Sequence, residues 1–265
     1  MLVLNLDNII NTIIQGDALE ILRQIPNDSI DLIVTDPPYF ISQKGNNISR
    51  RNLSSKTHKR NSDIKLDFGE WDHFDDDKAF LEFTENWFKE CVRILKPKSW
   101  IYIFFDRKKV GYFDLLLAHK YNITSKAMFV WCKTNPTPSF RKVSWVSATE
   151  FVWVGSKGES KIKNFLTQKE MYNYALTPNK SAYGKTEHPT EKPESVIERF
   201  IKTSSLEGDI VLDPFMGSGT TAVVAKKLGR KYIGIELNPK YIEIVNKRIN
   251  ETKVVDNLFA ASQNG

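Results

Sequence analysis

The chain has 265 residues, of which 41% are hydrophobic and 26% charged, and its formal net charge is +6. These fractions are typical of a soluble globular protein. No apolar run reaches the roughly 20 residues that a membrane-spanning helix needs, and segment 1–17 lacks the pattern of a secretory signal. Two distant cysteines, Cys91 and Cys132, exclude a disulfide framework and a cysteine-rich zinc site. We therefore expect a cytoplasmic protein with one large domain.

The charges are separated into blocks along the chain. Residues 41–65 hold seven Lys or Arg against Asp63, a net charge of +6, and residues 66–90 hold nine acids against two lysines, a net charge of −7. Residues 133–192 carry ten Lys or Arg against five Glu, a net charge of +5. A basic run rich in Ser, Asn and Gly, such as 41–65, favours phosphate binding, with an ordinary solvated loop as the alternative.

Short apolar runs alternate with longer amphipathic runs that have the helical repeat. In chain order, the pattern predicts a strand at 12–15, a helix at 18–24, a strand at 30–35, a helix at 80–95, a strand at 100–105, a helix at 112–119, and strands at 124–131 and 149–154. It then predicts a helix at 194–203, a strand at 210–213, a helix at 220–228, a strand at 232–236 and a helix at 240–249. This alternation implies a mostly parallel sheet covered on both faces. Irregular stretches at 41–70 and 135–190 interrupt it, and long loops of this kind are often functional.

The run from Asp213 to Thr221, Asp-Pro-Phe-Met-Gly-Ser-Gly-Thr-Thr, joins a predicted strand to a helix. Its glycines let backbone N–H groups approach a ligand, and the helix N-terminus favours an anionic group. The third glycine of the dinucleotide fingerprint is absent, which argues against a pyrophosphate. The next strand ends at Glu236, and a carboxylate there suits the hydroxyls of a ribose. These features predict a nucleoside ligand with a carboxylate and no diphosphate, which describes S-adenosylmethionine.

A second motif, Asp36-Pro37-Pro38-Tyr39, follows the predicted strand at 30–35. It therefore lies at the edge where open α/β sheets bind their ligands. Proline has no N–H group, so the backbone carbonyls and the Asp36 carboxylate remain as acceptors beside an aromatic ring. This set suits the exocyclic amino group of a base. A rigid turn is the alternative, and the presence of both motifs favours the functional interpretation.

The two motifs resemble those of the amino-methylating DNA methyltransferases, and more narrowly the β-group of adenine-N6 enzymes, in which Asp-Pro-Pro-Tyr precedes the glycine loop. The resemblance covers most of residues 12–250 and extends to four further segments: Gly16-Asp17-Ala18, Gly69-Glu-Trp-Asp72, Lys133-Thr-Asn135-Pro-Thr-Pro138 and His188-Pro-Thr-Glu-Lys-Pro193. It implies an α/β, circularly permuted Rossmann-like fold with a mostly parallel seven-stranded sheet. It also implies one catalytic domain at 1–250, insertions for DNA recognition at 41–70 and 135–187, and a tail at 251–265.

The resemblance also implies the residues that bind S-adenosylmethionine. They are Asp17, Ala18, Asp36, His188, Thr190, Lys192, Asp213, Phe215, Gly217, Ser218, Gly219, Thr220, Glu236 and Leu237. Two of these assignments have structural alternatives. Asp17 also suits the N-cap of the helix that begins at Ala18, and the segment around His188 also suits a rigid loop between prolines.

The catalytic residues that the resemblance implies are Asp36, Pro37, Pro38 and Tyr39. An adenine must leave the stacked duplex before its N6 can be reached. Tyr39 would then stack on the ring, while Asp36 and the Pro37 carbonyl would accept the N6 hydrogens. The leaving group is a neutral thioether, so we expect no need for a metal, and we expect both cysteines to serve in packing.

DNA is the expected partner. We expect contacts to it from Arg50, Arg51, Lys56, Lys59 and Arg60 in the basic run and from Lys133, Asn135, Arg141 and Lys142 further along. A second copy of the chain and a restriction endonuclease with the same recognition sequence are the other partners implied, in a bacterial or archaeal cytoplasm. A cytosine-N4 methyltransferase and a DNA-binding subunit with an inactive site are the alternatives. Asp36 favours adenine, because cytosine-N4 enzymes usually carry Ser at that position.

Overall fold

The computed structural model describes residues 3–38, 77–138, 145–178 and 191–254. The chain divides into two compact units, Met1–Pro37 with Glu85–Gly265, and Pro38–Thr84. In the second unit, the structure describes Pro38 and residues 77–84, which form the start of helix α3 (Asp77–Ile94). The insertion predicted at 41–70 therefore lies outside the described residues.

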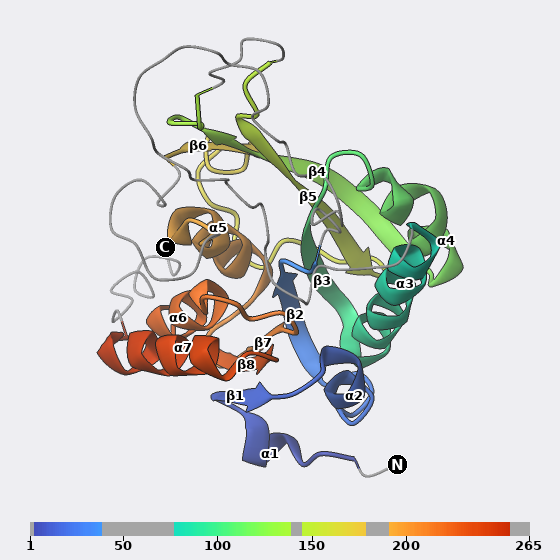
Figure 1. Ribbon diagram of the computed structural model, residues 1–265, viewed down its shortest axis with the longest axis vertical. Helices are drawn as coiled ribbons and strands as arrows, with labels where there is room; N and C mark the ends of the chain where they lie inside the picture. Colours follow the sequence, from blue (N-terminus) through green and yellow to red (C-terminus); the bar gives the residue numbers. More distant parts are fainter. Residues whose placement is uncertain (1–2, 39–76, 139–144, 179–190, 255–265) are drawn as a thin grey trace, which may run out of the picture. The chain divides into compact units, whose positions relative to one another are not determined.

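A single sheet forms the centre of the first unit (Figure 1). Its described strands are β1 (Thr12–Gln15), β2 (Ile30–Thr35), β3 (Leu95–Phe105), β4 (Ile123–Lys133), β5 (Thr149–Lys157), β6 (Tyr174–Thr177), β7 (Ile210–Asp213) and β8 (Lys231–Glu236). They are arranged in the order β1-β8-β7-β2-β3-β5-β4-β6. Neighbours from β1 to β3 are parallel, β5 is antiparallel to β3 and β4, and β6 is parallel to β4. The predicted mostly parallel sheet is confirmed.

The predicted number of seven strands is wrong, because the described residues form eight. The additional strand is β6, inside the stretch that the sequence predicted to be irregular. Of its four residues only Ala175 is buried, whereas all four residues of β7, a strand of the same length that the sequence predicted, are buried. The guanidinium of Arg199 holds this edge by donating hydrogen bonds to the carbonyls of Tyr172 (2.6 Å) and Tyr174 (2.8 Å). These are contacts between distant parts of the chain, which periodicity does not reveal.

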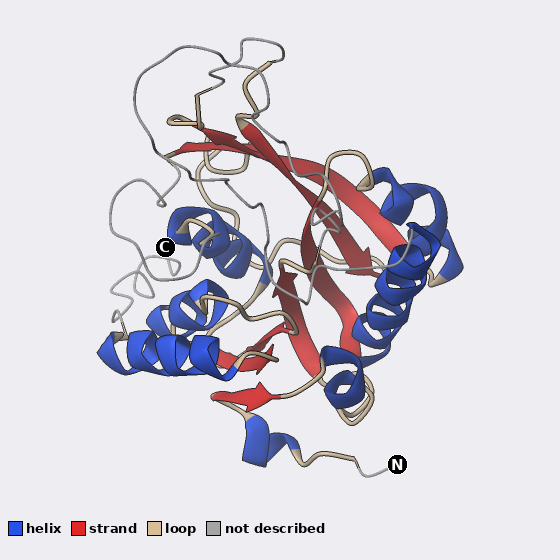
Figure 2. Ribbon diagram, viewed as in Figure 1, coloured by secondary structure: helices blue, strands red, loops and turns tan. Residues whose placement is uncertain are grey.

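The described helices of the first unit lie on both sides of the sheet (Figure 2). Besides α3, they are α1 (Leu6–Ile9), α2 (Ala18–Leu22), the π-helical turn η2 (Phe113–Leu117), α4 (Ala118–Lys120), α5 (Glu194–Ser204), α6 (Thr220–Lys227) and α7 (Pro239–Glu251). The helix predicted at 112–119 is therefore present in a mixed π and α form. No described helix combines the length and apolar character needed to cross a membrane.

Alternate side chains of β3 enter two aromatic clusters on opposite faces of the sheet, as the two-residue repeat of a strand requires. On one face, Tyr102 stacks on Phe200 of α5, with 4.3 Å between ring centroids. On the other, Phe105 meets Phe113 edge to face at 4.8 Å. Cys91 is fully buried, in agreement with its predicted packing role, and Cys132 is half-buried in β4.

Strand direction decides which residues gather at the functional edge. The parallel strands β1, β8, β7, β2 and β3 place their carboxyl ends at one edge. Since β5 runs the other way, its amino end reaches that same edge, with Phe151 paired to Phe105 at the end of β3 and Glu150 paired to Trp131 near the end of β4. Residues from both kinds of strand end therefore meet there.

Candidate active site

The glycine loop between β7 and α6 presents backbone to the edge of the sheet. Gly217 and Gly219 have φ angles of +51° and +80°, a region that side chains rarely adopt. A Cβ atom on Gly219 would lie 2.6 Å from Cγ1 of Val245 in α7, so only glycine fits. Helix α6 begins directly after it, at Thr220. The first N–H groups of this helix thus lie where an anionic ligand group is favoured, whereas the N–H groups of Gly217 and Gly219 are donated to Glu236 (2.8 Å) and to the Met216 carbonyl (2.9 Å).

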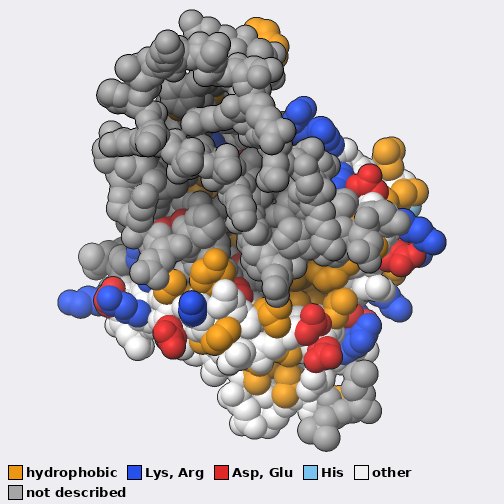
Figure 3. Space-filling model, viewed as in Figure 1, with side chains coloured by type: hydrophobic (Ala, Val, Ile, Leu, Met, Phe, Trp, Pro, Cys, Tyr) orange, Lys and Arg blue, Asp and Glu red, His pale blue; other side chains and the backbone are white. Residues whose placement is uncertain are grey.

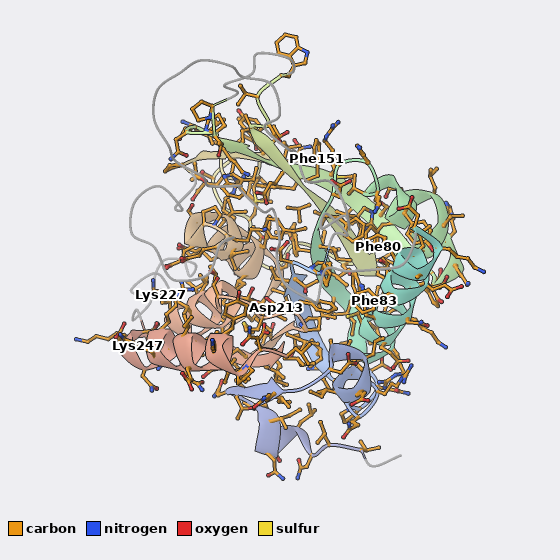
Figure 4. All side chains as sticks on the ribbon, viewed as in Figure 1. Phe80, Phe83, Phe151, Asp213, Lys227 and Lys247 are labelled. Carbon is orange, nitrogen blue, oxygen red and sulfur yellow. The ribbon has the colours of Figure 1, made fainter. Side chains whose placement is uncertain are left out.

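Asp213 connects this loop to β2 and α6 by hydrogen bonds. Its carboxylate accepts hydrogen bonds from the hydroxyls of Thr35 (2.9 Å) and Thr221 (2.9 Å) and from the N–H of Phe215 (3.1 Å). Burial raises the pKa of Asp213 to about 7, despite these donors. Figure 4 labels this side chain, at the end of β7. Asp213 joins the ends of β7, β2 and α6, and its predicted contact with a cofactor stays a prediction.

Glu236 connects the glycine loop to the start of α7. One carboxylate oxygen, Oε2, accepts from the N–H of Gly217 (2.8 Å), and the other, Oε1, accepts from the N–H of Asn238 (2.7 Å). Burial raises the pKa of Glu236. Each carboxylate oxygen can accept a further hydrogen bond. Beside it, Leu237 is exposed although its side chain is apolar.

Asp17 caps helix α2, as the structural alternative predicted. Its carboxylate accepts from the N–H of Glu20 (3.1 Å), while the preceding Gly16 donates its N–H to the Glu236 carbonyl (3.1 Å). This backbone bond brings the end of β1 to the end of β8. The buried Ala18 follows the cap. Asp17 therefore lies at the functional edge, in a position compatible with both roles.

A chain of four charged side chains lies at the end of β2. The ammonium of Lys192 is 2.5 Å from Oδ2 of Asp36 and 3.3 Å from Oε2 of Glu150. The other oxygen of Glu150, Oε1, is 2.6 Å from the ammonium of Lys133. The sequence had suggested Lys192 for the cofactor and Lys133 for DNA, and it had not singled out Glu150. The structure pairs both lysines with this glutamate.

The charges of these four side chains stabilise one another. Burial raises the pKa of Glu150, but the positive charges of Lys192 and Lys133 outweigh this effect and hold it below its usual value. Burial likewise lowers the pKa of Lys192, and the negative charges of Asp36 and Glu150 outweigh it, so the pKa lies well above its usual range. Glu150 and Lys192 consequently remain charged near neutral pH.

Arg248 of α7 is a second residue that the sequence did not single out. Its guanidinium donates hydrogen bonds to the Ser218 carbonyl of the glycine loop and to the Glu191 carboxylate, the latter at 2.8 Å. It thereby joins the segment that contains Lys192 to the glycine loop. An arginine on an amphipathic helix resembles an ordinary surface residue in sequence, so only the tertiary contacts reveal it.

Several predicted site residues lie outside the described part of the chain: Tyr39, Arg50, Arg51, Lys56, Lys59, Arg60, Arg141, Lys142, His188 and Thr190. Pro37 is buried after Asp36, and Asn135 is half-buried after β4. On the described surface in Figure 3, basic and acidic side chains lie side by side over α7. Because most of the residues predicted to contact DNA lie outside the described part of the chain, these contacts remain predictions.

An open α/β sheet with a glycine loop after β7, a carboxylate at the end of β8 and an Asp-Pro-Pro segment after β2 is typical of the Rossmann-like fold of S-adenosylmethionine-dependent methyltransferases. The model of the N6/N4 DNA methylase family matches residues 30–247, and the chain belongs to this family.

Individual relatives agree with this assignment. The chain is 37% identical to the type II methyltransferase M.HinfI of Haemophilus influenzae, over 94% of this chain and 71% of the relative. It is 30% identical to M2.DpnII of Streptococcus pneumoniae, over 91% of each chain. Among solved structures, the M1.HpyAVI–SAM complex has a TM-score of 0.68 and 28% identity, and it covers 90% of this chain and 98% of that one. The cytosine-N4-specific PvuII DNA methyltransferase shares the fold, with a TM-score of 0.66 and 23% identity over 94% of this chain and 87% of that one. The protein is a DNA methyltransferase.

Proposed function

We propose that the protein transfers a methyl group from S-adenosylmethionine to the N6 amino group of an adenine in DNA. The observation that carries this proposal is the position of Asp36: its carboxylate lies at the carboxyl end of β2, next to the buried Pro37, and the Lys192 ammonium holds it. Adenine rather than cytosine is proposed because of the aspartate itself, since cytosine-N4 enzymes usually carry Ser at this place in the motif.

The residues at the ends of β7 and β8 fit S-adenosylmethionine. The N-terminus of helix α6 suits its carboxylate, and the two oxygens of Glu236 suit its ribose hydroxyls. Leu237 adds an exposed apolar side chain for a purine ring. When bound, the cofactor supplies a methyl group activated by a sulfonium centre.

The chain's own residues orient the target amine. The Asp36 carboxylate and the Pro37 carbonyl accept its two N–H hydrogens, which turns the nitrogen lone pair toward the methyl group. The prolines of the motif have no N–H group and so cannot donate a competing hydrogen bond to these acceptors. Orientation of this kind can supply a large part of the rate acceleration. Tyr39 is proposed to stack on the flipped base, and stacking of this type contributes about 1–3 kcal/mol.

We extend the proposal to the DNA and to the cellular role. The basic residues of the 41–65 run and Arg141 and Lys142 are proposed to bind phosphates and base edges. Because the relatives M.HinfI and M2.DpnII are named type II methyltransferases, we propose a role in restriction–modification, with a cognate endonuclease as partner. A bacterial cytoplasm and a homodimer belong to the same proposal.

Methylation of genomic DNA tests the proposed function directly. Purified protein is incubated with S-adenosylmethionine and unmethylated genomic DNA, and the DNA is read by a sequencing method that distinguishes modified bases. We expect N6-methyladenine at one recurring short sequence. Detection of N4-methylcytosine alone would show that the target base is cytosine and not adenine. Unmodified DNA, together with S-adenosylmethionine binding shown by calorimetry, would contradict methyl transfer to duplex DNA.

A further inference from the structure

We propose that Glu150 is a positioning residue for methyl transfer, which acts by holding Lys192 against the Asp36 carboxylate. The inference rests on the proposed function, because it assigns a role to a residue behind Asp36. Glu150 does not itself belong to either sequence motif. Its side chain reaches the site because β5 is antiparallel to its neighbours and begins at the functional edge.

The contacts place Lys192 between two carboxylates. Its ammonium lies 2.5 Å from Asp36 Oδ2 and 3.3 Å from Glu150 Oε2, and 5.1 Å from the ring centroid of Phe104. Only 10% of the Lys192 side chain is exposed. This flexible side chain is thus restrained by Asp36 directly after β2, by Phe104 of β3 and by Glu150 of β5. Through this ammonium the protein sets the orientation of the Asp36 carboxylate.

Lys133 completes the arrangement on the far side of Glu150. Its ammonium is 2.6 Å from Glu150 Oε1, so positive and negative groups alternate from Lys133 through Glu150 and Lys192 to Asp36. Without the glutamate charge, two ammonium groups would share an uncharged neighbour and repel each other. Lys192 would then be less restrained, and the Asp36 carboxylate would lose its fixed orientation.

Stability alone is a poor explanation for this chain of charges. Buried ion pairs contribute little net stability, because desolvation offsets their attraction. Small errors in the position of a catalytic group, in contrast, reduce rates strongly. A set of charges that ends on the motif aspartate is therefore best explained by a need for orientation.

A matched pair of carboxylate-to-amide changes tests the inference. Glu150→Gln removes the charge at the amino end of β5. Asp28→Asn is the control, because Asp28 pairs with Lys157 at the other end of the same strand, at 2.7 Å. In single-turnover methyl transfer to genomic DNA, we expect Glu150→Gln to lower the rate constant at least tenfold. The dissociation constants for S-adenosylmethionine and DNA should change less than twofold, and Asp28→Asn should leave all three values within twofold.

A double-variant cycle tests whether Glu150 acts through Lys192. If it does, the variant with both Glu150→Gln and Lys192→Met should be no slower than Lys192→Met alone, because the intermediary is already lost. Effects that multiply would overturn the inference. A Glu150→Gln rate within twofold of the parent, or an equal loss of cofactor affinity, would overturn it as well.

Lysine acylation followed by mass spectrometry gives a readout that does not need activity. In the parent protein, Lys192 should react at least tenfold more slowly than the exposed Lys240. Glu150→Gln should accelerate the reaction at Lys192 several-fold, and Asp28→Asn should not. Unchanged labelling in a folded Glu150→Gln variant would overturn the contact. If the parent transfers no methyl group while its labelling behaves as expected, the proposed function fails and the contact itself stands.

Discussion

Two pairs of carboxylates at the same edge of the sheet are held by different kinds of donor. Asp213 and Glu236, at the ends of β7 and β8, accept hydrogen bonds from hydroxyls and backbone N–H groups. Asp36 and Glu150, at the end of β2 and the start of β5, are held by lysine ammonium groups. Burial raises the pKa of the first two, whereas the lysines hold the pKa of Glu150 below its usual value.

This difference shows that the hydrogen-bond donors around a buried carboxylate, rather than its residue type, decide the direction in which its pKa shifts. Neutral donors fix the backbone of a loop, and burial still raises the pKa of the carboxylates that they hold. Ammonium groups compensate the charge and restrain the carboxylate in direction, which suits an acceptor for a neutral amino group. The four variants below separate these roles.

The largest effect is expected at Asp36. Asp36→Ala removes an acceptor that orients the amine, and loss of one such group costs about 10²–10³-fold in rate. The cofactor affinity should change little, because the glycine loop and Glu236 remain. Single-turnover methylation and calorimetry measure the two quantities. A variant that methylates DNA at the parental rate would remove Asp36 from the reaction.

Gly219→Ala should lower the stability of the protein, because the added methyl group has no room in the glycine loop. The new methyl group would lie 2.6 Å from Val245 Cγ1, at a residue with a φ of +80°. The left-handed conformation costs about 1–2 kcal/mol, and overpacking adds about 1–3 kcal/mol. Urea unfolding should show this loss. Gly111→Ala is the control: nothing lies within 4 Å of its added Cβ, so its stability should stay equal or rise by up to about 1 kcal/mol. Equal stabilities of the two variants would contradict the packing argument.

Glu236→Ala should weaken cofactor binding without slowing transfer at saturation. Loss of hydrogen bonds to a charged group costs about 1–3 kcal/mol, which is about 5–150-fold in the dissociation constant. Calorimetry with S-adenosylmethionine measures it. Glu243→Ala, an exposed residue of α7, serves as the control and should bind like the parent. An unchanged dissociation constant for Glu236→Ala would remove this residue from the cofactor site.

The effect expected at Asp213 is a change in the pH dependence of stability. Its pKa is raised from 3.8 to about 7 in the folded protein, so between these values the folded state binds a proton that the unfolded state has released. Its contribution to stability therefore falls as pH rises from about 4 to about 7, by at most about 1.4 kcal/mol per pH unit. Asp213→Asn removes this titration.

Denaturant unfolding at several pH values compares the parent with Asp213→Asn. The variant should gain stability relative to the parent as pH rises toward 7. A constant difference between the two proteins over this range would show that Asp213 is ionised throughout. In that case the hydroxyl and N–H donors would outweigh burial, and the comparison with Glu150 would lose its electrostatic basis.

The sequence by itself determined the order of most strands and helices and the two motifs. Periodicity reports which residues are buried by an element, and strands such as β1, β2 and β7 were predicted with the bounds that the structure shows. The glycine loop and Asp36 were recognisable because their chemistry depends on residues adjacent in the chain. Asp17 was recognisable as a helix cap for the same reason.

Only the tertiary structure decided which distant charges meet. Glu150, Lys192 and Asp36 lie far apart in sequence, and they come together because β5 is antiparallel while β2 and β3 are parallel. Local patterns give the type of an element but not its neighbours or its direction in a sheet. Arg248 and the edge strand β6 escaped prediction for the same reason, since long-range hydrogen bonds define both of them.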